Sequence, residues 1–290
     1  MTRTAYLIDG MAYVFRSFFG MRPMSSPDGT PINAVFGLGM TLQRFLHEHQ
    51  PELVGCCFDA GSQTFRNTIY PDYKANRGAP PEELIPQFDI CRELVAKMGI
   101  ATFTHPGWEA DDLIATWTRL LVDTGHEVVI VTGDKDLAQL ICPQVKIYDL
   151  ARDDWWDEER VPLKMGVTAD KVCDLLALTG DAVDNIPGVR GIGPKAATAL
   201  LENFRDLDDI YANLEGVGEL PIRGAKGLRK KLEDGQDNAR LSRQLVQLDH
   251  EAPCQGQAAD LAYSGADSSD LEAFADLWGL GRVASRIPRR

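Results

Sequence analysis

Residues 127–140, EVVIVTGDKDLAQL, constrain the fold of this chain more than any other stretch. The apolar, β-branched run at residues 128–131 is typical of a strand that is buried on both faces. Two carboxylates, Asp134 and Asp136, follow this run almost at once. Open α/β sheets hold their functional sites at the carboxyl ends of such strands. The stretch therefore predicts an acidic site at a sheet edge, although Asp134 as a simple helix cap is an alternative.

Two further apolar runs end in the same way. Residues 5–8 are followed by Asp9, and residues 53–58 by Asp59. The ends of parallel strands lie on one edge of a sheet, so three carboxylates would converge there. The sequence predicts further strands at 100–104 and 145–150, and the fold class is a mostly parallel α/β sheet with flanking helices. The predicted helices of this part are 11–19, 34–47, 82–98 and a helix from Glu109 to about residue 122.

Other acidic residues stand at predicted helix starts and turns. Glu109, Asp111 and Asp112 lie in the opening turn of one helix, where the helix dipole favours negative charge. On an ideal helix Glu109 and Asp112 share a face and Asp111 points elsewhere. Asp181 and Asp184, three residues apart, follow a predicted helix at 169–179. These acids either stabilise local structure or join the same site.

A glycine-rich turn, GVRGIGPK at residues 188–195, precedes a predicted helix at 196–203. Pro194 suits the first position of a helix. Glycines at a helix N-terminus let backbone N–H groups approach a phosphate. A plain helical hairpin is the alternative.

Two segments are basic in a chain whose net charge is −13. Residues 65–77 combine Arg66, Lys74 and Arg77 with two tyrosines, which suits phosphate contact and base stacking but also an ordinary solvated loop. Residues 223–231 hold five cations and no acid. Residues 152–160 carry two tryptophans among charges, and we expect a surface or junction without chemistry.

Composition limits the class of protein. The 290 residues include 44% apolar residues, and no apolar run approaches the ~20 residues of a membrane span. The start lacks a signal peptide, and the six cysteines form no CxxC pair. We expect a cytoplasmic protein with reduced thiols.

The nine acids with site-like placement have no histidine among them. An all-oxygen cluster favours Mg²⁺ or Mn²⁺ over zinc. Two like charges 4 Å apart cost ~4 kcal/mol at an effective dielectric constant near 20, so the cluster must raise its pKa values or bind metal.

Seven blocks in this order resemble the 5′-nuclease (flap endonuclease) family, most closely the N-terminal 5′–3′ exonuclease domain of bacterial DNA polymerase I. They are LIDG (7–10), FDA (58–60), YKANR (73–77), GWEADD (107–112), TGDKDL (132–137), LTGDAVDNIPG (178–188) and GVRGIGPKAA (188–197). The resemblance covers roughly residues 4–250.

The resemblance implies two metal sites. Asp9, Asp59, Glu109 and Asp111 would form the first, with Asp112 acting directly or through water. Asp134, Asp136, Asp181 and Asp184 would form the second, with Mg²⁺ bound and Mn²⁺ able to substitute.

The resemblance also implies contacts with DNA. Lys74 and Arg77 would steer the scissile phosphate, Tyr73 would stack near the terminal base, and Arg16 would contact phosphate. Residues 188–195 would form a helix–hairpin–helix turn that grips duplex phosphates through Gly188, Arg190, Gly191, Gly193 and Lys195. The carbonyls of Val189 and Ile192 could hold K⁺.

The expected organisation is a PIN-like or resolvase-like α/β core at 1–167 with a helical arch at about 66–98. A helical subdomain at 168–250 carries the hairpin motif, and an extension at 251–290 contains a helix near 271–280. The implied activity is a structure-specific 5′–3′ exonuclease or flap endonuclease of DNA replication and repair, active on 5′ flaps, nicks, 5′ ends and RNA-primed strands.

The implied partner is a DNA polymerase that acts separately or forms a missing C-terminal part, and we expect a nucleoid-associated monomer. Two alternatives stay open. A PIN-like ribonuclease would use the sheet-edge acids and leave the hairpin unused, and a non-catalytic DNA-structure binder would use the acids only for structural ions.

Overall fold

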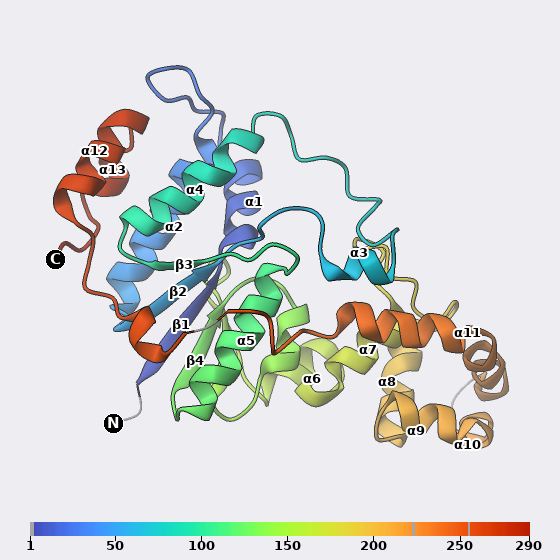
Figure 1. Ribbon diagram of the computed structural model, residues 1–290. Helices are drawn as coiled ribbons and strands as arrows, with labels where there is room; N and C mark the ends of the chain where they lie inside the picture. The colour runs from blue at the N-terminus through green and yellow to red at the C-terminus, as the bar shows by residue number, and fades with distance from the viewer. Residues whose placement is uncertain (1–2, 222–223, 255) are drawn as a thin grey trace.

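A six-stranded sheet forms the centre of the computed structural model, which describes residues 3–221, 224–254 and 256–290 (Figure 1). The strand order is β3-β2-β1-β4-β5-β6, in which the first five strands are parallel and β6 is antiparallel to β5. The predicted mostly parallel sheet is therefore confirmed. The strands are β1 (Thr4–Asp9), β2 (Leu53–Cys57), β3 (Ala101–Phe103), β4 (Glu127–Val131), β5 (Val145–Asp149) and β6 (Asp154–Trp156).

The three strands that end near aspartates are direct neighbours, as the sequence predicted. β1 lies between β2 and β4, with Asp9 opposite Cys57 and Ile8 opposite Val131. Asp9, Asp59 and Asp134 therefore leave the sheet at the same edge.

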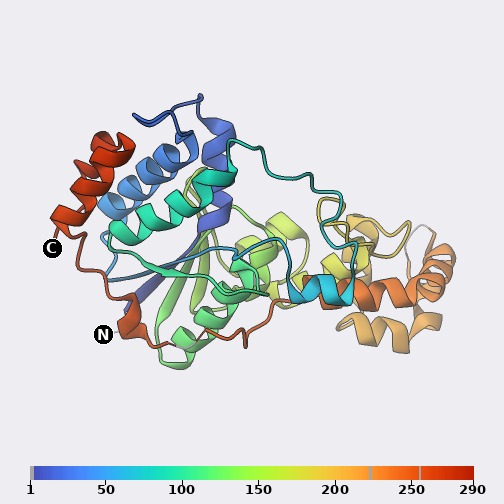
Figure 2. The same ribbon diagram turned by 45° about the horizontal axis from the view of Figure 1, so that its top comes forward.

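Helices cover both faces of the sheet because its side chains alternate between two apolar cores. Leu7 belongs to one core and Ile8 to the other. The Ile8 core is closed by five helices, which lie together in Figures 1 and 2: α1 (Gly10–Gly20), α2 (Asn33–His49), α4 (Ile85–Lys97), α12 (Ser268–Trp278) and α13 (Gly281–Ala284). The Leu7 core is covered by α5 (Ala110–Asp123) and the 3₁₀ turn η1 (Asp136–Leu140).

The helical subdomain continues the Leu7 core and lies beside the sheet on the side of α3 (Phe65–Ile69) (Figures 1 and 2). Its longest helix, α11, packs against α7 and α10. Its elements are η2 (Ala169–Lys171), α7 (Val172–Thr179), α8 (Pro194–Asn203), α9 (Leu207–Ala212), α10 (Leu214–Glu219) and α11 (Ala225–Val246).

The segment expected as an arch divides between two parts of the molecule. Its first part is the short helix α3, and turns and loop follow up to α4. α4 packs against α2 and buries Cys91 and Leu94 in the Ile8 core. Only the part before α4 spans the gap between the sheet and the helical subdomain.

The end of the chain returns to the α/β core and does not form a separate extension. The 3₁₀ turn η3 (Ala258–Leu261) contacts β2, and α12 contacts α4. A side chain at Gly39 of α2 would meet Val283 of α13 at 2.6 Å, so this glycine permits close contact between the two helices.

The sequence analysis missed two elements between residues 152 and 165. Residues 152–160 lie mostly at the surface, as expected, but residues 154–156 form β6, and α6 (Arg160–Met165) follows. Trp155 stacks on Tyr148 of β5, with ring centroids 4.4 Å apart. This contact between β5 and β6 stabilises an edge strand in a stretch that is rich in charged residues.

Other properties concern the whole chain. All six cysteines lie within the described ranges and are free. Among the helices of those ranges, none is long and apolar enough to cross a membrane. Of the basic residues at 223–231, Arg223 lies outside the described residues.

Candidate active site

A cleft of about 160 Å³ lies at the carboxyl edge of β1, β2 and β4 and reaches the helical subdomain. Residues far apart in the chain line it, including an apolar wall of Leu245, Val246 and Leu248 at the end of α11. Four side chains that carry cations or a phenol face it: Arg66, Tyr73, Lys74 and Arg77. Seven carboxylates line it: Asp9, Asp59, Glu109, Asp111, Asp134, Asp136 and Asp184.

Backbone and hydroxyl donors hold the carboxylates at the strand ends. Asp9 ends β1 and caps α1, with the Ala12 N–H donating to Oδ1 at 3.0 Å. The Thr132 hydroxyl donates to Asp9 Oδ2 at 2.8 Å and accepts from the Asp134 N–H at 3.0 Å. Thr132 is fully buried, so it joins the ends of β1 and β4. We did not predict its role, although a polar residue directly after an apolar run was a visible signal.

Local turns position Asp59 and Asp134. The Ala110 N–H at the start of α5 donates to Asp59 Oδ1 at 2.7 Å. Asp134 does not cap a helix, because its Oδ1 accepts from the Asp136 N–H at 2.9 Å within a tight turn. This turn presents both acids to the cleft.

Cations and a phenol from the segment after α3 surround Glu109. Lys74 Nζ donates to Glu109 Oε1 at 2.8 Å, and the Tyr73 hydroxyl donates to Oε2 at 3.1 Å. Tyr73 is buried, with 5% of its surface exposed, and stacking of its ring near the terminal base stays a prediction. Arg77 forms an ion pair with Asp184, and Lys74 Nζ lies 3.9 Å from the same carboxylate.

Two predicted metal ligands lie outside the lining of the cleft. Asp181 stands at its margin, where Lys135 Nζ is 3.4 Å from Oδ2 and the Val183 N–H donates to Oδ1. Asp112 is completely buried and forms a two-pronged ion pair with Arg66 at 2.7 and 2.8 Å. Both oxygens of Asp112 therefore accept hydrogen bonds from Arg66, and its role in metal binding, directly or through water, stays a prediction. Arg66, one of the cations of the segment at 65–77, is buried for the same reason.

The electrostatics of the cleft are those of a crowded anionic site. Burial, and then Asp134 and Asp59, raise the pKa of Asp9 to about 6. Burial and the neighbouring Asp134 raise the pKa of Asp136 to about 7. Loss of hydration together with Asp9 and Asp134 raises the pKa of Asp111 well above its usual value.

The pKa of Glu109 behaves differently. Burial favours its neutral form, but Lys74 and Arg66 outweigh this and lower its pKa. Burial raises the pKa of Asp184 despite Lys74 and Arg77. Protein cations therefore neutralise one side of the cleft, and the other side stays anionic.

The donor set fits hard divalent cations. Asp136 Oδ1 is buried without a hydrogen-bond partner among the described residues, and the Lys135 ammonium is 3.7 Å away. The ligands that the cleft offers are carboxylate oxygens, which suit Mg²⁺ or Mn²⁺. Within the described ranges no three carboxylates are closed around one point, and Lys74 and Arg77 form ion pairs with Glu109 and Asp184.

The glycine-rich turn directly follows the loop that carries Asp184. The loop is closed by paired bonds between the backbones of Asp181 and Ile186. Gly188 and Gly191 have φ values of +59° and +82°, which favour glycine. Val189 and Ile192 are buried, and the Val189 carbonyl accepts from the Ile192 N–H at 2.9 Å.

The rest of the turn faces solvent and leads into α8. Arg190, Gly193 and Lys195 are exposed, and Pro194 begins α8 as predicted. Arg16 is also exposed, on α1, whose first residues line the cleft. The cleft and an exposed glycine turn with two cations thus belong to one continuous body.

Comparison with known families gives two matches that together cover most of the chain. The model described as 5'-3' exonuclease, N-terminal resolvase-like domain, matches residues 4–166. The model described as 5'-3' exonuclease, C-terminal SAM fold, matches residues 167–269.

Curated relatives fall into two length classes. The chain is 43% identical over 256 residues to DNA polymerase I of Rhizobium leguminosarum, a match that covers 86% of this chain and 25% of that protein. It is 35% identical over 294 residues to a 5'-3' exonuclease of Bacillus subtilis, covering 98% of this chain and 97% of that protein. The chain thus spans about a quarter of the polymerase and nearly all of the shorter relative.

Solved structures share the fold. T5 5'-exonuclease with bound divalent metal ions (zinc) superposes with a TM-score of 0.71 at 21% identity, over 97% of this chain and all of that one. The catalytic core of Rad2 in complex with DNA substrate gives 0.65 at 16% identity, over 99% and 92%. At these identities the likeness extends to the fold alone.

Proposed function

Because the chain belongs to the 5'-3' exonuclease family, we propose that it hydrolyses phosphodiester bonds near the 5′ ends of DNA. Its substrates are 5′ flaps, nicked duplexes and RNA-primed strands of replication and repair, and its products carry a 5′-phosphate and a 3′-hydroxyl. The observation that carries the proposal is the cleft, where seven carboxylates from strand ends, the start of α5 and the loop after α7 meet Lys74 and Arg77. The family's relatives named 5'-3' exonuclease and DNA polymerase I support it.

Mg²⁺ is the ion we propose for this cleft, with Mn²⁺ as a substitute. Asp9, Asp59, Glu109 and Asp111 belong to one site, and Asp134, Asp136, Asp181 and Asp184 to the other. When bound, paired divalent ions stabilise the attacking and leaving oxygens of a phosphodiester displacement. The fold neighbour T5 5'-exonuclease, solved with divalent metal ions, supports a metal-binding role.

The chain's own residues bind and orient the phosphate in this proposal. Lys74 and Arg77 exchange their carboxylate partners for the scissile phosphate, which adds charge-assisted hydrogen bonds to it. Tyr73 keeps Glu109 oriented through its hydroxyl. Arg16 and residues 188–195 bind phosphates of the strand and the duplex through cations and backbone N–H groups.

Further parts of the proposal concern the surroundings of the enzyme. K⁺ on the carbonyls of Val189 and Ile192 strengthens the grip of the turn on DNA. The protein acts as a monomer in the cytoplasm, at the nucleoid. A DNA polymerase, on a separate chain or further along the same one, fills the gap that primer removal leaves.

The direct test uses a 5′-labelled flap duplex with Mg²⁺ and with EDTA. We expect short labelled products only with Mg²⁺. Asp134→Asn should slow cleavage about a thousandfold or more, because loss of a metal ligand removes several kcal/mol of charge stabilisation in the transition state. Asp276→Asn is the matched control, because Asp276 is an exposed acid on α12 outside the cleft.

Three outcomes would contradict parts of the proposal. Cleavage by Asp134→Asn at the wild-type rate would show that the cleft is not the site. Preference for single-stranded RNA over the flap would identify a ribonuclease. An intact flap that is bound with and without Mg²⁺ would identify a non-catalytic DNA-structure binder.

A further inference from the structure

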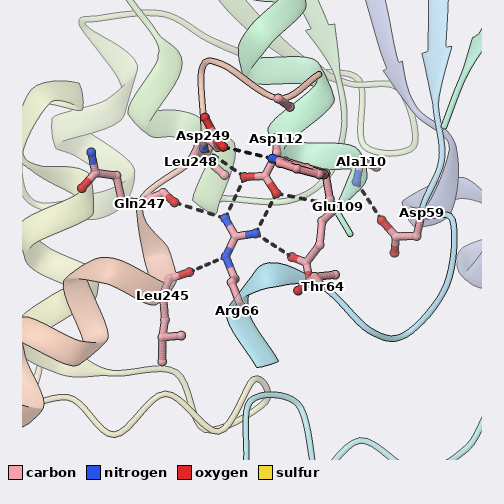
Figure 3. A network of polar contacts seen from close by, with 12 residues as sticks. Asp59, Thr64, Arg66, Glu109, Ala110, Asp112, Leu245, Gln247, Leu248 and Asp249 are labelled. Atoms are coloured by element: carbon pink, nitrogen blue, oxygen red, sulfur yellow. Dashed lines mark hydrogen bonds and ion pairs between the residues drawn. The ribbon is translucent and has the colours of Figure 1, made fainter. Parts of the chain in front are cut away.

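The end of α11 is bound to the cleft by hydrogen bonds from two side chains, the buried Arg66 and the partly buried Gln139. Leu245, Val246 and Leu248 form one wall of the cleft. Arg66 of α3 donates from Nε to the Leu245 carbonyl at 2.7 Å and from Nη2 to the Gln247 carbonyl at 3.1 Å. Figure 3 shows this guanidinium between the end of α11 and Asp112.

The same guanidinium reaches the acids at the start of α5. Arg66 binds both oxygens of Asp112, and its Nη1 lies 3.6 Å from Glu109 Oε2 (Figure 3). Asp112 in turn accepts from the backbone N–H groups of Glu109, at 3.2 Å, and of Asp249, at 3.0 Å. One buried ion pair therefore sets the position of Glu109 relative to the segment that follows α11.

Gln139 fastens the same segment from the opposite side of the cleft. Its amide nitrogen donates to the Val246 carbonyl at 3.1 Å and to the Asp136 carbonyl at 2.9 Å. Its amide oxygen accepts from the Leu248 N–H at 3.3 Å. Gln139 thus connects the end of α11 to the turn that carries Asp134 and Asp136.

The other part of α11 touches the glycine-rich turn. The Ser242 hydroxyl accepts from the Gly188 N–H at 2.9 Å, and Ser242 is fully buried. Lys231 Nζ donates to the Gly191 carbonyl at 2.8 Å. A single helix therefore contacts the proposed duplex-binding turn along its length and the carboxylate cleft at its end.

We propose that Arg66 and Gln139 are positioning residues that hold the end of α11 in register with the cleft, so that duplex bound at residues 188–195 places the scissile phosphate between Lys74 and the carboxylates. The inference rests on the proposed nuclease function. It assigns a task to two residues that touch neither substrate nor ligand. Buried ion pairs are unreliable as a source of stability, and specifying one arrangement is their better-attested use.

Arg66→Lys is the main test, because lysine keeps the charge but cannot span two carboxylate oxygens and two carbonyls with a fixed planar fork. In single-turnover cleavage of the labelled flap at saturating protein with Mg²⁺, we expect the rate to fall about a hundredfold, the size of loss that follows a 1 Å misplacement. Flap affinity measured by fluorescence anisotropy in EDTA should stay at the wild-type value.

Gln139→Ala is the second variant, which keeps the test usable if Arg66→Lys folds poorly. Its single-turnover rate should fall about tenfold with unchanged flap affinity, since the substitution removes one of the two sets of hydrogen bonds that hold the end of α11. Arg190→Ala at the exposed turn should instead weaken flap binding.

The matched control is Arg119→Lys. Arg119 lies on α5 and donates to the His250 carbonyl at 3.0 Å, so it also reaches the segment after α11, but from an exposed position. It should cleave and bind as the wild type does. Urea denaturation of each variant in EDTA gives the folded fraction, by which every rate is corrected.

Two results would overturn the inference. Corrected rates of Arg66→Lys and Gln139→Ala equal to that of Arg119→Lys would show a purely structural role. Equal losses of rate and affinity would place these residues in DNA binding. Failure of the wild-type protein itself to cleave with Mg²⁺ would instead reject the proposed function.

Discussion

Asp111 and Asp112 are adjacent in the chain, yet they belong to two regions with opposite electrostatics. Asp112 forms a buried ion pair with Arg66, and both charges of this pair have partners at hydrogen-bond distance. Asp111 lines the cleft, where Asp9 and Asp134 raise its pKa. One region therefore holds compensated charges, whereas the other keeps unfavourable charge that a bound cation can relieve.

The largest effect on stability is expected when the buried ion pair of Arg66 and Asp112 loses one of its charges. Asp112→Asn leaves the buried Arg66 cation without its counter-charge and should lower the free energy of unfolding by about 3–5 kcal/mol. Urea denaturation in EDTA measures the change. Asp123→Asn on the exposed end of the same helix is the control and should stay within about 0.5 kcal/mol of wild type. A loss from Asp112→Asn no larger than that of the control would mean that the two regions do not differ as we describe.

A smaller effect is expected when a cation enters the anionic region. Saturating Mg²⁺ at about 100 times its Kd should stabilise the wild-type protein by ~2.7 kcal/mol, which corresponds to roughly 5 °C or more in Tm. Thermal unfolding with Mg²⁺ and with EDTA measures the shift. Asp134→Asn should show a smaller shift, and Asp276→Asn the wild-type shift. Equal shifts in all three proteins would place the bound ions outside the cleft.

The smallest expected effect is the loss of folding stability that the negative charge of Asp136 itself causes. Asp136 has a pKa of about 7 in the folded protein, above the ~3.9 of an unperturbed aspartate. The folded state therefore holds the proton more tightly, and ionisation of Asp136 lowers stability as pH rises from about 4 to about 7. Asp136→Asn should accordingly be more stable than wild type in EDTA above this window.

The pH dependence makes this last prediction specific. The advantage of Asp136→Asn should vanish below about pH 3, where the wild-type carboxyl is protonated in both the folded and the unfolded state. Denaturation series at several pH values give the difference curve, and Asp276→Asn should give a flat one. An Asp136→Asn variant less stable than wild type throughout would show that local hydrogen bonds outweigh the repulsion.

The sequence by itself determined the sheet and most of the acids in the cleft. Apolar runs at β1, β2 and β4 are local signals, and a parallel arrangement brings the aspartates after them to one edge. The helix at α5 and Pro194 at the start of α8 also follow from local rules. These features can be predicted without knowing their distant partners, because the periodicity of apolar residues, helix caps and turn residues depend only on neighbouring positions in the sequence.

Only the tertiary structure decided which acid of the pair at 111–112 faces the cleft. Helical phase placed Glu109 and Asp112 on one face, but Arg66 captures Asp112 from a distant part of the chain. Tyr73 is likewise buried against Glu109, and β6 forms only by pairing with β5. In each case a long-range partner compensates a charge or completes a hydrogen bond, and its approach depends on how the elements pack, which no local pattern encodes.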